Sequence, residues 1–69
     1  MLVIHENIPN MVSQITGYIS AEGINIETMV NKSRKDMAVT VMDTAALPSQ
    51  KALDQLKQLA GVLRVRTFA

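Results

Sequence analysis

Short apolar runs and amphipathic stretches alternate along this chain and predict six secondary-structure elements. The run Leu2-Val3-Ile4-His5 is rich in branched side chains, which is typical of a central strand. Apolar positions then recur every three or four residues from Ile8 to Ile19, which indicates one buried helix face. We therefore expect a helix from about Pro9 to about Glu22, with Gly23 as its stop.

The middle of the chain has the pattern of a hairpin. Ile24-Asn25-Ile26 alternates strictly, but the alternation slips near Thr28-Met29-Val30, which predicts a bulge or a strand that is apolar on both faces. The polar segment Ser33-Arg34-Lys35-Asp36 predicts the turn. The run from Met37 to Met42 is apolar except for Thr40, as expected for a strand inside a sheet.

The last third of the chain repeats the order of helix and strand. Residues 43–48 are expected to form a loop, and Ser49 is expected to cap a second helix whose apolar residues gather on one side. Gly61 ends this helix, and residues 62–68 alternate. The alternation puts Leu63 and Val65 on one face and the two arginines, Arg64 and Arg66, on the other, which predicts a half-exposed strand.

The order strand, helix, strand, strand, helix, strand predicts an α+β ferredoxin-like βαββαβ sandwich. Right-handed crossovers put both helices on one face of a four-stranded antiparallel sheet. The first and third strands are then central, and the second strand lies at an edge. The opposite face of the sheet is open, and we expect Met29, Met37 and Met42 to lie on it. An apolar open face and an unpaired edge both favour dimers.

Composition limits the classes of function. A chain of 69 residues with 48% apolar content forms one small domain with a modest core. A formal charge of +1, with one Phe and one Tyr, gives neither a basic stripe nor a stacking platform for nucleic acid. With no cysteine and one histidine, neither a disulfide nor a metal site is expected.

The sequence also argues against a membrane protein and against an independent enzyme. No apolar run approaches the roughly 20 residues of a membrane span, and no signal peptide is evident, so we expect a cytoplasmic protein without a membrane partner. No nucleophile and base are coupled in the sequence, so no catalytic residue is assigned.

The junction His5-Glu6-Asn7-Ile8-Pro9-Asn10 carries the most informative polar residues. It leads from a strand into a helix, whose first amides lack intrahelical partners and carry the positive end of the helix dipole. A small zwitterion fits there, because its carboxylate is favoured beside such amides. Each residue also has a simpler interpretation: Asn7 as a helix cap, His5 as a histidine without function, and Asn25 as an exposed strand residue.

Four segments together resemble an ACT domain, in particular the C-terminal regulatory domain of D-3-phosphoglycerate dehydrogenases. They are HENIPN at 5–10, AEGINI at 21–26, NKSRKDMAVTVMD at 31–43 and GVLRVR at 61–66. The resemblance covers essentially the whole chain. It implies that residues 1–69 are a regulatory amino-acid-binding domain from the C-terminal part of a longer NAD-dependent enzyme, with no cofactor of its own.

The resemblance also implies a ligand and a site. L-serine would bind between two copies of the domain and inhibit the first committed step of serine synthesis. His5 and Asn7 would come from one chain and Asn25 from its neighbour, with Ile8, Asn10 and Met11 beside them. The two copies would pair edge to edge into one eight-stranded sheet.

Asn10 departs from the family pattern, which usually has glycine at this position. A backbone kept bare for close approach of the ligand gains a side chain, although Asn10 could instead cap the helix or bond the ligand. Two alternatives therefore stay open: a dimerisation domain that binds no ligand, and an ACT domain of an L-serine dehydratase or another amino-acid enzyme.

Overall fold

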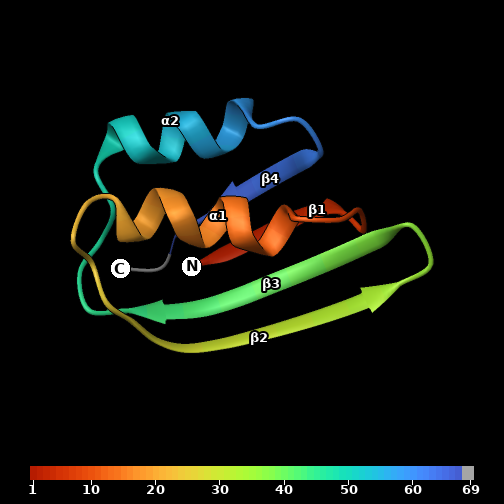
Figure 1. Ribbon diagram of the computed structural model, residues 1–69, viewed down its shortest axis with the longest axis horizontal. Helices are drawn as coiled ribbons and strands as arrows, with labels where there is room; N and C mark the ends of the chain where they lie inside the picture. Colours follow the sequence, from red (N-terminus) through yellow and green to blue (C-terminus); the bar gives the residue numbers. More distant parts are fainter. Residues whose placement is uncertain (68–69) are drawn as a thin grey trace.

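Two helices cover one face of a four-stranded antiparallel sheet in the computed structural model, which describes residues 1–67 (Figure 1). The elements are β1 (Leu2–Glu6), α1 (Met11–Ser20), β2 (Ile26–Arg34), β3 (Met37–Thr44), α2 (Gln50–Gln58) and β4 (Val62–Arg66). The strand order is β2-β3-β1-β4, so β1 and β3 are central and β2 is an edge, as predicted. This is the predicted ferredoxin-like order; the predicted strand position of Phe68 lies outside the described residues.

The core lies between the helices and the face of the sheet that they cover. Residues of α1 that are four positions apart form one buried stripe, as the helical repeat requires. This stripe packs with the apolar side of α2 and with alternate residues of β1 and β3. The buried members of this cluster are Met1, Val3, Met11, Ile15, Ile19, Met42, Leu53 and Leu56.

The methionines are distributed differently from the prediction. Met37 lies on the open face and is 41% exposed, but Met42 is buried on the helix side. Met29 pairs directly with Met42 and therefore shares the helix-side face. The placement of Met29 and Met42 on the open face was wrong, because Met37 and Met42 are five positions apart and a regular strand alternates its faces at every residue.

Two irregularities interrupt the ladders. The predicted bulge in the second strand is confirmed by a register shift between Ile26 and Thr28. A second shift, between Ile4 and His5, leaves Leu63 of β4 without a partner in the ladder, and this side chain is 57% exposed. The prediction that Leu63 shares a face with Val65 was therefore wrong, because a bulge breaks the alternation on which it depended.

The first helix is shorter than predicted at both ends. It begins at Met11 because Asn10 has φ 67°, in the left-handed region, which interrupts the helical backbone after Pro9. It ends at Ser20, and Gly23 follows with φ 74°. Asparagine is among the few residues other than glycine that adopt such a conformation readily, so the sequence at position 10 suits the turn.

The second helix starts as predicted, with Ser49 as its cap. The Ser49 hydroxyl oxygen accepts a hydrogen bond from the amide of Ala52 at 3.1 Å. Glu22, from the turn after α1, accepts hydrogen bonds from both the amide and the hydroxyl of Ser49. These bonds lower the pKa of the Glu22 carboxyl below its ordinary value of 4.5, and the positive end of α2 stabilises the same charge.

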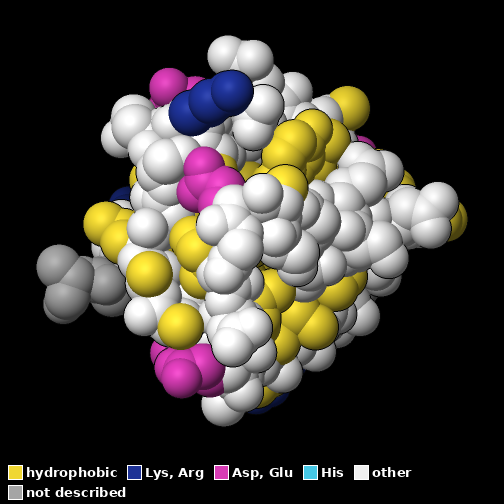
Figure 2. All heavy atoms as spheres, turned by 60° about the vertical axis from the view of Figure 1, so that its left-hand side comes forward, with side chains coloured by type: hydrophobic (Ala, Val, Ile, Leu, Met, Phe, Trp, Pro, Cys, Tyr) yellow, Lys and Arg dark blue, Asp and Glu magenta, His cyan; other side chains and the backbone are white. Residues whose placement is uncertain are grey.

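Hydrophobic side chains also reach the surface. Figure 2 shows them at the end of the molecule where α1 passes into β2 and β3 passes into α2. Leu47, in the loop before α2, is 61% exposed. A chain of this size cannot cover all of its apolar surface.

Within the described part of the chain, neither helix has the length and apolarity that a transmembrane segment needs.

The bond between Glu22 and Ser49 predicts a pH dependence of stability. Because the folded state lowers the pKa of Glu22, the ionised form contributes stability above pH 4.5, and this contribution is lost as pH falls through the lowered value. We expect Glu22→Gln to lower the free energy of unfolding at pH 7 and to have little effect at pH 2 to 3, measured by urea denaturation.

Asp54→Asn is the matched control, because it makes the same charge change at an exposed residue of α2, and its side-chain oxygen can still accept the hydrogen bond from Gln50. An equal loss of stability in the Glu22 variant at pH 7 and at pH 2 to 3 would contradict the assignment.

Candidate functional site

Asn7 connects the end of β1 to the loop of the β2–β3 hairpin. Its backbone amide donates to the carbonyl oxygen of Asp36 at 2.7 Å, and its side-chain Nδ2 donates to the carbonyl oxygen of Lys35 at 3.1 Å. Asn7 is exposed, and no hydrogen bond within residues 1–67 uses its side-chain Oδ1. Asn7 therefore has a structural role and keeps one acceptor that faces solvent.

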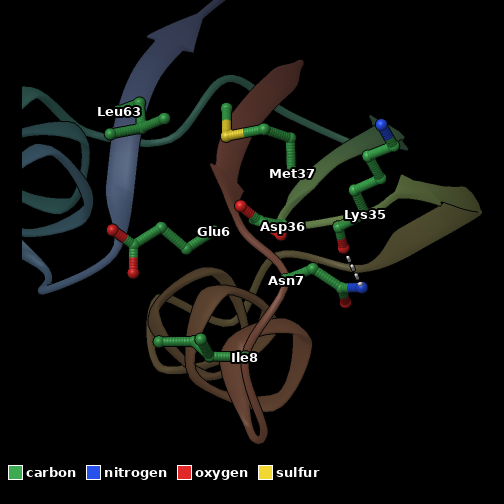
Figure 3. A pocket seen from close by; sticks show the side chains of 7 residues that line it. All are labelled: Glu6, Asn7, Ile8, Lys35, Asp36, Met37 and Leu63. Carbon is green, nitrogen blue, oxygen red and sulfur yellow. Dashed lines mark hydrogen bonds between the residues drawn. The ribbon is translucent and has the colours of Figure 1, made fainter.

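A hollow of about 510 Å³ opens beside this connection. Figure 3 shows Leu63 on one side of it and Asn7 and Lys35 on the other, with Asp36 between them. The walls combine carboxylates, one ammonium group and apolar side chains: Glu6, Asn7, Ile8, Lys35, Asp36, Met37 and Leu63. The carboxylates favour a cationic group of a ligand, and the apolar residues favour an aliphatic part.

Ile8 is held at the edge of the hollow by Gly61. Ile8 is 44% exposed, and a side-chain carbon added at Gly61 would lie only 3.2 Å from its Cδ1 atom. The same added carbon would lie 3.1 Å from the sulfur of Met11. Gly61 has φ 96°, so both its backbone angle and this close approach require glycine.

His5 faces the core rather than the hollow. Its side chain is 2% exposed, and both ring nitrogens have partners within the chain. Nδ1 lies 2.8 Å from the carbonyl oxygen of Glu6, and Nε2 lies 2.8 Å from the hydroxyl oxygen of Thr40. In this arrangement neither nitrogen is free to bind a ligand.

The partners of His5 define the direction of a buried hydrogen-bond chain. A carbonyl oxygen only accepts, so Nδ1 carries the proton and Nε2 of the neutral ring accepts from the Thr40 hydroxyl. The Thr40 oxygen in turn accepts from Nδ2 of Asn31 at 2.8 Å. This chain links the end of β1 through β3 to the edge strand β2, and it satisfies polar groups that would be costly to bury alone.

Asn10 and Met11 contribute to the start of α1 in different ways. The side chain of Asn10 makes no capping hydrogen bond, whereas its carbonyl oxygen accepts from Gln14 at 3.0 Å. The first turn of α1 has no acidic residue. Met11 is 2% exposed and belongs to the core, so its side chain anchors the start of α1 and does not face a ligand.

Asn25 lies at the opposite end of the molecule from Asn7. It precedes β2, whereas Asn7 is bonded to Lys35, which follows β2. A strand of nine residues that advances about 3.3 Å per residue separates the two by about 30 Å. Within one chain the structure therefore brings together Asn7 and Ile8, but not Asn25.

The sequence did not single out Glu6, Lys35 or Asp36 as lining residues. The turn itself was predicted, but its contact with the junction follows from the pairing of Glu6 with Met37, which only the register of β1 against β3 reveals. Among the described residues, no three His, Cys, Asp or Glu side chains gather in a way that suits a metal ion.

Comparison with known proteins identifies a similar solved structure. No protein-family model matches the chain, and no match is found among curated proteins. The chain is similar to the crystal structure of protein BT0572 from Bacteroides thetaiotaomicron, with a TM-score of 0.62 and 26% sequence identity. The match covers 90% of this chain and 44% of that one, so the chain spans less than half of that protein. The comparison supports the βαββαβ fold.

The hydrogen-bond chain through Thr40 predicts a measurable contribution to stability. Thr40→Val keeps the shape of the side chain but leaves His5 Nε2 and Asn31 Nδ2 without their partner. We expect it to lower the free energy of unfolding by about 1 to 3 kcal/mol, measured by urea denaturation.

Thr40→Ser is the matched control, since it keeps the hydroxyl and loses one methyl group, at a cost of about 0.8 kcal/mol. If Thr40→Val proved as stable as Thr40→Ser, the Thr40 hydroxyl would not stabilise the protein through its hydrogen bonds to His5 and Asn31.

Proposed function

We propose that this chain is an ACT-type regulatory domain that binds a small amino acid, with L-serine as the leading ligand, between two copies paired through β2. The enzyme that it would regulate is an NAD-dependent D-3-phosphoglycerate dehydrogenase. The observation that carries the proposal is the placement of Asn7 and Asn25 at opposite ends of an exposed edge strand.

Antiparallel pairing of β2 with β2 of a second copy would join the two asparagines. Such a pair relates the start of one strand to the end of the other. Asn25 of one copy would then lie beside Lys35 and Asn7 of the other, so two equal sites would form, one at each end of the paired strands. A distance of about 30 Å within one chain becomes a short distance between two chains.

The charges along β2 favour this antiparallel arrangement. Glu27 lies near the start of the strand, and Lys32 and Arg34 lie near its end. Antiparallel pairing brings Glu27 of one copy toward the cations of the other, whereas parallel pairing in register would stack like charges. All of β2 except Ile26 is exposed, so the edge is open to a partner.

A zwitterion matches the groups around the junction. The carboxylates of Glu6 and Asp36 suit an ammonium group, and the Oδ1 atom of Asn7 can accept from the same group or from a hydroxyl. The first turn of α1, which has no side-chain cap, suits a carboxylate. His5 acts in this proposal as a positioning residue, because its bonds to Glu6 and Thr40 fix the end of β1.

The left-handed conformation of Asn10 gives a backbone reason for the residue found there. The family usually has glycine at this position, and asparagine is among the few other residues that adopt φ 67° readily. Asparagine meets the same requirement, so the departure from the family pattern leaves the turn intact.

One observation favours a second candidate, a dimerisation domain without a ligand. Both ring nitrogens of His5 and the Nδ2 of Asn7 already have partners within the chain. If these bonds do not exchange for bonds to an amino acid, the site has fewer donors than the resemblance implies.

Calorimetric titration with L-serine separates the two candidates. We expect binding to the unmodified chain and at least about tenfold weaker binding to Asn25→Ala, since a lost pair of hydrogen bonds costs about 1.4 kcal/mol or more. Gln55→Ala, an exposed change on α2, is the control and should bind as the unmodified chain does.

Sedimentation of the same samples completes the test. A chain that is dimeric but gives no heat with L-serine would support the ligand-free candidate and contradict the first. A chain that is monomeric at all concentrations and gives no heat would contradict both.

A further inference from the structure

The face of the sheet that the helices leave open has an ordered charge pattern. Residues that pair across strands share a face, so the register defines rows across the sheet. One row runs Lys32, Val39, Ile4, Arg64, and the next runs Val30, Val41, Leu2, Arg66. Each row therefore has apolar residues on the two central strands and a cation at β4, and the first also has a cation at β2.

We name the apolar residues of the two central strands on this face the apolar strip: Leu2, Ile4, Met37, Val39 and Val41. Met37 is 41% exposed and Val41 is 39% exposed, and the other three are half-buried. Lys32 and Arg34 bound the strip along β2, and Arg64 and Arg66 bound it along β4. A hollow of about 360 Å³ lies between the β2 cations and the strip.

Positively charged side chains are concentrated on this face. Four of the seven Lys and Arg residues of the chain lie on it, whereas the carboxylates in its register rows are Glu6 and Asp43, at opposite ends of the sheet. Glu27 falls at the bulge of β2 and has no partner in the register. Asp43 accepts a hydrogen bond from Thr28 at 2.9 Å. The open face is thus more positive than the whole chain, whose formal charge is +1.

We propose that the open face is a docking surface for an amphipathic α-helix that has an apolar ridge and acidic residues on both flanks. The cations at the two edges lie three strand spacings apart, or about 14 Å. An α-helix with its side chains is about 10 to 12 Å wide, so it fits between them. Its ridge would cover the apolar strip, and its acidic flanks would meet the arginines and Lys32.

A second copy of this chain suits the open face poorly. A two-fold axis that stacks two such faces puts cations of β2 over cations of β2, or cations of β2 over those of β4. Either arrangement opposes like charges. Among residues 1–67, nucleic acid finds no Phe, Tyr or Trp to stack on at this face, because the one such residue in that range, Tyr18, lies on α1.

The docking surface shares Lys32 and Arg34 with the proposed edge pairing, in which Glu27 of a second copy lies near them. Arg64 and Arg66, on β4, take no part in that pairing, so a change on β4 tests the docking surface separately. Met37 and Glu6 also line the hollow beside Asn7. A helix on the strip would therefore reach the border of the candidate amino-acid site.

Two peptide probes test whether the open face prefers a helix with acidic flanks. Each has about 18 residues, enough for a helix in water, and a leucine ridge; one has Glu on both flanks and the other has Lys. By fluorescence anisotropy, we expect the Glu peptide to bind at least about tenfold more tightly than the Lys peptide, with the difference shrinking as salt is raised. Equal affinities would overturn the proposal.

Variants of the chain locate the binding. The double variant Arg64→Glu, Arg66→Glu should weaken binding of the Glu peptide about tenfold or more, and Lys32→Glu, Arg34→Glu should act in the same way. The matched control, Lys51→Glu with Lys57→Glu, makes the same charge change on α2 and should bind nearly as the unmodified chain does. An equal loss in the control would mean that only net charge matters, which would overturn the proposal.

The remaining outcomes concern other occupants. NMR shift mapping with the Glu peptide should place the largest changes at Ile4, Val39 and Val41. Tighter binding of phosphatidylserine vesicles or of single-stranded DNA than of the Glu peptide, lost in the same variants, would assign the face to another class of partner. Self-association of the protein that depends on Arg64 and Arg66 would assign the face to a second copy of the chain. Each of these outcomes would overturn the proposal.

Discussion

The antiparallel pairing of β1 with β3 is the constraint on which the other features depend. It opposes Glu6 to Met37 and so carries the end of β1 to the loop of the hairpin, where Asn7 bonds to Lys35 and Asp36. It also aligns His5 with β3 so that its ring reaches Thr40. One register therefore places the junction, the hollow beside it and the buried polar chain beneath it.

Much of the fold could be predicted from periodicity, because each element has its own repeat. The bulge near Thr28 and the cap at Ser49 followed from local patterns, and the edge position of β2 followed from the order of the elements. The two errors have different causes. Leu63 is displaced by an irregularity opposite β1, which depends on strand pairing, whereas Met42 points inward because it lies five positions after Met37 and a strand alternates its faces.

The candidate site was predictable only in part. Asn7 and Ile8 lie together, as the junction suggested, but the polar lining of the hollow comes from a loop about 30 residues later. The burial of His5 was not predictable either, because the sequence does not reveal that Thr40 lies opposite it in the core. The left-handed backbone of Asn10 gives a physical reason for glycine or asparagine at that position.

The two surfaces of the sheet that remain uncovered have different chemistry. The edge of β2 offers backbone groups and charges of both signs, which suits pairing with its own copy. The open face offers an apolar strip between cations, which suits a helix of opposite charge. In the function that we propose, the domain would thus have one surface for assembly and another for contact with a different segment.

We propose that Asn7 and Asn25 act in one site but come from different chains, and a mixture of two variants tests this arrangement. Asn7→Ala and Asn25→Ala are each expected to lose binding of L-serine. After unfolding and refolding together in equal amounts, half of the dimers are mixed and each holds one intact site. Titration should then recover about one quarter of the sites of the unmodified protein. Recovery of no sites, from two variants that each fold and dimerise, would contradict a site shared between chains.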